Sequence, residues 1–441
     1  MKSYCEILKL VWPLALGMIN NAVMQFVDRA YLAADSLGAL EAVLPAGMLM
    51  WIFAGFFQSV VGYSSVLVGQ YHGAGEDGRC RETYRITLWL SLAFGALSVP
   101  LVFLGNWFLG AVAGSPQLLA DERSYFSVMM AGSVFVYGQM AAASYFTGRG
   151  KTRIVFWVNL LGNVLNIALD PFLIFGWCGL PAMGIAGAAI VSVFAMAVQM
   201  AVLVGFAHRE AFSRPGAGEC RRKIVGTLLR YGVPSGVYGV LNCLSFTIFV
   251  FITGGVGPLE LAVSNACFTV NYLVFAPMEG FAIGASTLVA QACGRGDTAA
   301  AIRDARRTIA LGVGLVTVTS VLVLVFSGPI LSVFASKAGA DAAAFLSLGR
   351  TLFVLMAVWQ VFDATDIILG GALKGAGDTR FVMSWMLFCS FAVWLPLVFV
   401  VRHFRNTMPA LWATMIVFVV LVSVGSVIRW HRGKWKTHRL T

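Results

Sequence analysis

The stretch SVLVGQYHGAG, residues 65–75, returns 221 residues later as STLVAQACGRG, residues 286–296. The matching residues are Gln70, Gly73 and Gly75 in the first copy and Gln291, Gly294 and Gly296 in the second. A second pair, GRGKTR at residues 148–153 and GAGDTR at residues 375–380, follows in the same order at nearly the same shift. The chain therefore contains two copies of one structural unit.

Both copies lie in a chain of very apolar composition. The 441 residues are 59% hydrophobic and only 12% charged, whereas an ordinary soluble domain carries about 25% charged residues. Apolar runs of about 18 residues or more recur along the whole length, and each is long enough to cross a bilayer as a helix. The sequence therefore predicts an all-α polytopic membrane protein.

We predict twelve transmembrane helices. They are expected at residues 8–33, 40–70, 84–110, 125–147, 154–176, 183–207, 227–254, 259–292, 305–334, 343–372, 381–401 and 408–428. Six helices separate the copies, and an even number of crossings preserves direction. The copies are therefore two six-helix lobes related by pseudo-two-fold symmetry along the membrane normal. The expected domains are an N-terminal lobe (1–207), a cytoplasmic linker (208–226) and a C-terminal lobe with a basic tail (227–441).

The distribution of Lys and Arg predicts the orientation. With both termini in the cytoplasm, 25 of the 31 Lys and Arg residues fall on the inside and 6 on the outside. Cytoplasmic loops carry such an excess, so we expect a multi-pass protein of the cell (inner) membrane with both termini cytoplasmic. Basic residues beside anionic lipid account for the net charge of +11, and we expect no nucleic-acid partner.

The clear cases of acids in the helix interiors of the first copy are Asp28 in the first predicted helix and Asp170 in the fifth. Because charge at bilayer depth is costly, such residues need a compensating role. Asn166 lies one turn before Asp170 on the same face, and Pro171 leaves the carbonyl of Ile167 without its helical hydrogen bond. These oxygens suit a small hard cation or one shared proton. The alternative is a structural Asp–Asn hydrogen bond between two helices.

The second copy has apolar residues at the places equivalent to these three polar ones. The pairs are Asp28 with Phe249, Asn166 with Val393, and Asp170 with Leu397. If the polar group of the first copy binds an ion, we expect it to do so once, in the N-terminal lobe.

The repeated motifs resemble those of the multidrug and toxic compound extrusion (MATE) transporters. The resemblance rests on GALKGAGDTR at residues 371–380, NIALDPFLIFG at residues 166–176, the paired Gln-x-x-Gly-x-Gly turns and the prolines of the first and seventh helices. It implies alternating-access export of organic compounds, expected to be cationic and amphipathic, by antiport with Na⁺ or H⁺. We therefore expect a monomer without enzymatic activity or cofactor. Its expected partners are a small organic substrate, the coupling cation and the lipid bilayer.

The resemblance also assigns roles to residues. It implies a cation or proton site in the N-terminal lobe that comprises Asp28, Asn166 and Asp170, the three residues at which Na⁺ is expected if Na⁺ is the ion. Ser192 falls where relatives carry a hydroxyl residue, and Ala188 falls where they supply a carbonyl.

A second polar set lies in the C-terminal copy: Asp363 and Asp366 on the tenth helix, Glu279 on the eighth and Asn242 on the seventh. Asp363 falls where one branch of the family has a cation-linked acid, but that branch has a glutamate at the place of Asn242. We therefore expect this set to form a substrate or accessory site. A structural role for Glu279 is the alternative.

Two other functions remain open from the sequence. A lipid-linked precursor flippase of the same superfamily would be expected to have a strongly basic central cavity, whereas the charges at membrane depth here are mostly acidic. An intramembrane enzyme would need a paired-acid motif, an H-E-x-x-H motif or a convergent Ser/His set. The five histidines all fall in predicted loops or in the tail.

Overall fold

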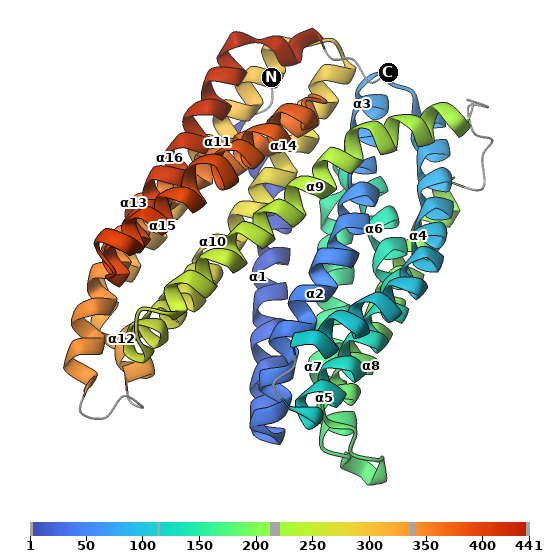
Figure 1. The fold of residues 1–441 in the computed structure, drawn as a ribbon. Helices are drawn as coiled ribbons and strands as arrows, with labels where there is room; N and C mark the ends of the chain where they lie inside the picture. Colours follow the sequence, from blue (N-terminus) through green and yellow to red (C-terminus); the bar gives the residue numbers. More distant parts are fainter. Residues whose placement is uncertain (1–2, 113–114, 212–220, 336–340, 438–441) are drawn as a thin grey trace. The chain divides into compact units, whose positions relative to one another are not determined.

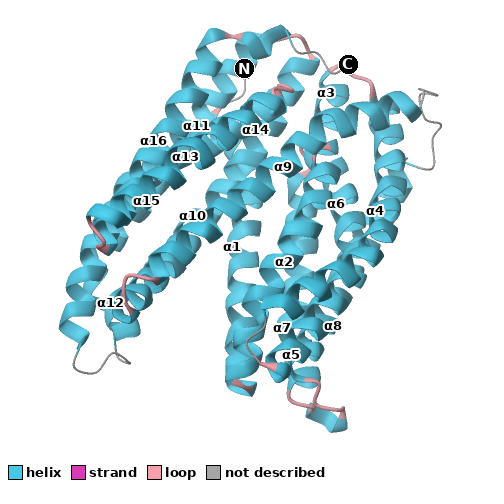
Figure 2. Ribbon diagram, in the orientation of Figure 1, coloured by secondary structure: helices cyan, strands magenta, loops and turns pink. Residues whose placement is uncertain are grey.

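The computed structural model describes residues 3–112, 115–211, 221–335 and 341–437. These parts are almost entirely helical and contain no strand (Figure 1; Figure 2). Within these described ranges, eleven spans are long and apolar enough to cross a membrane, and a bent helix pair, counted as one span, gives a twelfth. The prediction of an all-α protein with twelve transmembrane helices is confirmed. Part of the predicted linker, residues 212–220, lies outside the described residues.

The described residues of the first half form eight α-helices and a short 3₁₀ turn, Trp177–Gly179. The α-helices are α1 (Tyr4–Asp35), α2 (Leu37–Gly62), α3 (Ser64–Gly73), α4 (Asp77–Val112), α5 (Pro116–Ala131), α6 (Ser133–Gly148), α7 (Thr152–Ile174) and α8 (Gly184–Ala211). Two predicted spans are each made of two helices: α2 with α3, and α5 with α6, which are bent by 42°.

The start of α5 differs from the sequence prediction, which placed it at residue 125. The helix begins at Pro116 because Ser115 caps it, with its hydroxyl accepting a hydrogen bond from the backbone N–H of Leu118 (3.3 Å). Proline suits the first turn of a helix, where its missing N–H has no helical partner to lose.

The second half forms α9 (Arg221–Gly254), α10 (Pro258–Gly294), α11 (Thr298–Val325), α12 (Ser327–Ala335), α13 (Ala342–Gly375), α14 (Thr379–Leu387), α15 (Leu395–Phe404) and α16 (Met408–Arg432). A π-helical segment, Phe388–Trp394, joins α14 to α15, and a 3₁₀ turn, Lys434–Thr437, follows α16. Helix α13 packs against both α11 and α16.

The helices form two compact units whose boundaries fall inside continuous helices. The first-half unit comprises Leu16–Val240 and Ala290–Gly296, and the second-half unit comprises Met1–Ala15, Leu241–Val289 and Asp297–Arg439. Helices α1, α9 and α10 are therefore each divided between the two units. The domain limits expected from the repeat, 1–207 and 227–441, remain a prediction.

The glutamine and glycine of the repeated stretch meet their own copies inside the first-half unit. A Cβ atom added to Gly73 would lie 2.1 Å from the carbonyl oxygen of Gln291, and one added to Gly294 would lie 2.0 Å from that of Gln70. Only glycine fits such a distance. The last turns of α3 and α10 therefore cross through a reciprocal backbone contact, which explains why this motif occurs in both copies.

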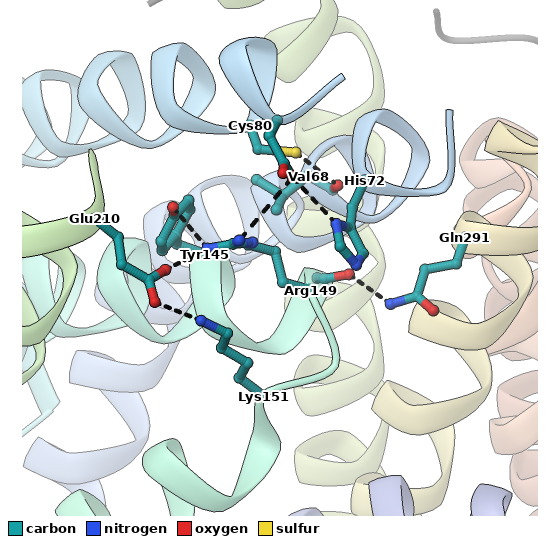
Figure 3. Close-up of polar contacts among 10 residues, drawn as sticks. Val68, His72, Cys80, Tyr145, Arg149, Lys151, Glu210 and Gln291 are labelled. Atoms are coloured by element: carbon teal, nitrogen blue, oxygen red, sulfur yellow. Dashed lines mark hydrogen bonds and ion pairs between the residues drawn. The ribbon is translucent and has the colours of Figure 1, made fainter. Parts of the chain in front are cut away.

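Ion pairs fix the turn between α6 and α7 in the first-half unit (Figure 3). Glu210, in the last turn of α8, pairs with both Arg149 and Lys151 of this turn. Arg149 also donates to the Tyr145 hydroxyl (2.9 Å). Burial lowers the pKa of Arg149, but Tyr145, Glu210 and Asp77 together raise it above its ordinary value. The guanidinium therefore stays charged.

The second-half unit makes the same connection with the charges reversed. Asp378, which corresponds to Lys151 in the repeat, accepts two hydrogen bonds from Arg429 in the last turn of α16, at 2.7 and 3.1 Å. Arg429 also lies over the Phe381 ring, with 4.8 Å between its guanidinium carbon and the ring centroid. Each unit thus ties a turn of the repeated motif to its last helix.

We expect Asp378→Asn to destabilise the protein by about 2 kcal/mol, because a nearly buried bidentate hydrogen bond to a charged group is lost. The measurement is the midpoint of thermal unfolding in detergent. Asp341→Asn, at an exposed position, is the control and should leave the midpoint unchanged. Equal midpoints for wild type and Asp378→Asn would show that this pair does not support the fold.

Candidate functional site

The first-half unit places two membrane-depth acids against each other. Asp28 on α1 and Asp170 on α7 lie within hydrogen-bonding reach of one another. Asp170 is fully buried, and no donor reaches its two carboxyl oxygens or Oδ1 of Asp28 among the described residues. A carboxylate only accepts hydrogen bonds. The two groups can therefore bond to each other only when one of them carries a proton.

Asn166 adds a further oxygen to this pair. Its side-chain Nδ2 donates to Ser192 Oγ on α8 (3.2 Å), and its Oδ1 is buried with no donor among the described residues. The hydrogen bond to Ser192 holds the amide by its nitrogen and leaves the oxygen available. Asp28, Asn166 and Asp170 thus present buried oxygens that lack a donor, the arrangement that a hard cation or a proton satisfies.

The connection between α7 and α8 brings Ser192 to this place. The backbone N–H of Met183 donates to the Leu173 carbonyl (2.8 Å), and a Cβ on Gly187 would lie 2.5 Å from that same carbonyl oxygen. The backbone of α8 therefore lies directly against the end of α7. Ala188 follows at once and is buried in an apolar cluster with residues of α1 and α7, such as Leu32.

One residue near the pair escaped the sequence analysis. The Tyr125 side chain, on α5, lies near Asp28, Arg29 and Asp170 and also packs on the apolar cluster that contains Ala188. Tyrosine is neither charged nor unusual in a membrane helix, so no sequence signal distinguishes Tyr125 from the other tyrosines. Only the packing of α5 against α2 and α8 brings it to the acids.

The equivalent place in the second half is an aromatic core. Phe249, which corresponds to Asp28 in the repeat, is fully buried. Its ring stacks on Trp394 of the π-helical segment (5.2 Å between centroids, 27° between planes) and meets Phe268 edge-on. Aromatic rings therefore occupy the position in the second-half unit at which the first-half unit holds an acid.

The second polar set is only partly brought together. Asp363 and Asp366 lie near each other on α13, and Lys374 lies near both Asp366 and Glu279 of α10. Asp366 is buried and accepts a hydrogen bond from Ser426 Oγ on α16 (2.6 Å). Asn242 on α9 is exposed, and no contact among the described residues joins it to this set.

We expect Asp170→Asn to stabilise the protein in sodium-free buffer at pH 8. Asparagine removes one of two facing carboxylates and supplies a donor to Asp28, so the midpoint of thermal unfolding in detergent should rise by about 2 °C or more. Asp121→Asn, at a half-buried acid of α5, is the control and should change little. A lower midpoint for Asp170→Asn than for wild type would contradict the arrangement of unpaired acids.

Comparison with known proteins places this geometry in a family. The MatE family model matches residues 13–172 and 234–400, one segment in each half. The chain is 26% identical over 405 residues to "Probable multidrug resistance protein NorM" of Rhizobium meliloti, covering 88% of this chain and 84% of the relative. It is also 26% identical over 404 residues to the multidrug resistance protein PmpM of Pseudomonas aeruginosa, with coverages of 89% and 82%.

Solved structures show the same fold. A mutant of the Vibrio cholerae MATE transporter VcmN superimposes with a TM-score of 0.87 at 15% identity, over 99% of this chain and 98% of that one. A MOP superfamily transporter from Pyrococcus furiosus superimposes with a TM-score of 0.85 at 18% identity, over 98% and 96%. These matches bear out the two-lobed, twelve-helix prediction, and the family is one of transporters and not of enzymes. The chain is a multi-pass membrane protein that belongs to the MATE family of multidrug efflux transporters.

Proposed function

We propose that the protein exports organic compounds by antiport with Na⁺ or H⁺, and that Asp28 and Asp170 bind the coupling ion together with Asn166. The observation that carries this proposal is the buried group of carboxyl and amide oxygens without donors. Unsatisfied oxygens at membrane depth are costly. An ion that enters the group removes that cost, so occupancy and the packing of α1 against α7 are linked.

Ala188 and Ser192 have supporting roles in this proposal. Ser192 accepts the hydrogen bond that fixes the Asn166 amide, and the backbone of α8 at Ala188 supplies a carbonyl. Ion binding rearranges α1 and lowers affinity for the organic substrate in the outward-open state. Release of the ion inward resets the cycle. No other cofactor takes part, and the protein works as a monomer.

We assign substrate recognition to the second-half set. Lys374 lies near Asp366 and Glu279, and Asp363 lies near Asp366. These three acids outnumber the single lysine, and such an excess of negative charge favours cationic, amphipathic compounds. Asn242, exposed on α9, is a further candidate contact. The names of the relatives, multidrug resistance proteins, agree with a site that accepts varied compounds.

The test of coupling is efflux of an organic cation, such as ethidium, from proteoliposomes under separately imposed Na⁺ and pH gradients. One of the two gradients should drive wild-type efflux, whereas Asp28→Asn should abolish gradient-driven efflux, because a direct ligand or proton carrier is lost. Efflux by Asp28→Asn at the wild-type rate would show that the pair is not the coupling site.

Asp363→Asn is the matched variant, since it also removes one acid from a transmembrane helix. It should change the affinity for the organic cation and leave the half-saturating ion concentration of exchange nearly unshifted, because the second half holds Phe249 where the first holds Asp28. A shift of the ion dependence in Asp363→Asn as large as that in Asp28→Asn would place ion binding in both lobes.

We also propose that the protein lies in the inner membrane with both termini and the linker in the cytoplasm, from the excess of Lys and Arg on that side. The test uses single cysteines on a cysteine-free background in intact cells, with a membrane-impermeant thiol reagent outside. A cysteine at the exposed Arg222 should stay unlabelled, whereas one at the exposed Arg405 should react. Labelling at Arg222 would reverse the orientation.

A further inference from the structure

A second polar contact joins α1 to α7 besides the acid pair. Asn163 Nδ2 donates to Asn21 Oδ1 at 2.8 Å, and Asn163 is almost fully buried. Neither asparagine is among the site residues that the sequence analysis expects. Within lipid, an amide hydrogen bond of this kind is a specific contact, because the surrounding hydrocarbon offers no alternative partner.

The amide pair and the acid pair are two successive polar contacts between α1 and α7, called here the amide rung and the acid rung. Asn21 precedes Asp28 by seven residues, and Asn163 precedes Asp170 by seven residues. Seven residues are two helical turns, about 10 Å along the axis, so both rungs lie on the same faces of α1 and α7. The shared direction shows that α1 and α7 run parallel. The amide rung therefore fixes the register that places Asp28 opposite Asp170.

The two rungs differ in what they need. The amide rung is neutral and complete, with its donor and acceptor both supplied by the protein. The acid rung lacks a donor and is complete only with a proton or a cation. The contact between α1 and α7 is therefore permanent at Asn21 and Asn163. Two turns further on, at Asp28 and Asp170, the contact forms only when a proton or a cation is bound.

Helix α7 is itself held in place on its other sides. Asn159, one turn before Asn163, accepts a hydrogen bond at its side-chain oxygen from Gln139 Nε2 of α6 (3.0 Å). Its carbonyl oxygen accepts another from Gln199 Nε2 of α8 (3.3 Å). Gly162 leaves room for the Gln199 side chain, since a Cβ there would lie 1.9 Å from Nε2. Helix α7 is thus held in place by α6 and α8, and α1 is attached to α7 through the amide rung and the acid rung.

We propose that Asn21 and Asn163 are positioning residues that confine the ion-dependent movement of α1 to the part after Asn21. The inference rests on the proposed coupling role of Asp28 and Asp170. With the amide rung closed, loss of the ion separates only the part of α1 that carries Asp28. Without it, the repulsion between the two acids acts on a longer part of the helix, and the acids lose their register.

The experiment measures the mobility of a spin label on α1 in the full-length reconstituted protein, with and without the coupling ion. Labels are attached at Leu16→Cys and Phe26→Cys, two exposed positions before and after Asn21, on a cysteine-free background. In the protein with both asparagines, the ion should change the signal at position 26 and not at position 16. The titratable groups near the acid pair are Arg29 and Tyr125, and both stay unchanged.

Asn163→Leu removes the amide rung and replaces the amide with an apolar side chain of similar size. The ion response should then reach position 16, and the half-saturating ion concentration should rise about fivefold, the factor expected for one net hydrogen bond. Asn21→Leu should have the same effect, and the double variant should not exceed either single one, because all three lack one shared contact. Either single variant suffices if the other fails to fold.

Gln139→Leu is the matched control. It removes an amide–amide hydrogen bond from the same helix, but one that joins α7 to α6 and not to α1. Its ion response and half-saturating concentration should stay near those of wild type. Equal shifts in Gln139→Leu and Asn163→Leu would overturn the inference, because they would show a general loss of packing.

Two outcomes separate this inference from the proposed function. If Asp28→Asn abolishes the ion dependence while Asn21→Leu and Asn163→Leu retain wild-type label responses and half-saturation, the positioning role is wrong and the coupling site stands. If Asp28→Asn retains the ion dependence, the coupling site itself is wrong.

Discussion

Two facing carboxyl groups without a donor are the constraint around which the first-half unit is arranged. Asp170 is fully buried, and it faces a second acid, Asp28, on another helix. Lipid supplies neither water nor counter-ions at this depth. The surrounding parts hold the oxygens in place: Ser192 fixes the Asn166 amide, the amide rung sets the register of α1, and the apolar cluster with Tyr125 packs beside them.

The two copies share the backbone crossing and the turn contacts more closely than they share the residues buried inside each unit. The glycine crossing occurs in both copies of the motif, and the ion pair to the last helix recurs with reversed charges, Lys151 with Glu210 and Asp378 with Arg429. Reversal is tolerated because the attraction between two opposite charges does not depend on which helix carries the positive one. Inside the units, by contrast, Phe249 stacked on Trp394 stands where Asp28 would be. Duplication of the backbone has not duplicated the site.

Sequence reasoning reached the helices and the acids because each leaves a local signal. Apolar runs predict the spans, and helical spacing puts Asn166 and Asp170 on one face. Contacts between helices leave no such signal. Tyr125 comes to the acids through the packing of α5, and the Asn21–Asn163 rung depends on the register of α1 on α7. The π-helical segment Phe388–Trp394 is likewise undetectable from periodicity, since it accompanies the packing of Trp394 between Phe249 and Phe418.

The seven-residue interval between the rungs links the fold to the coupling. A single polar contact would let α1 rotate or slide on α7, and the acids would then meet in more than one way. Two rungs two turns apart define both the rotation and the translation of one helix on the other. Because only the acid rung depends on an ion, the amide rung preserves the alignment while the acid rung opens. The acids then return to the same geometry when the ion binds again. A neutral amide pair suits the position of Asn21 and Asn163, because its strength does not change with pH or salt. An ion pair there would include a carboxylate that competes with the acids for the same cation.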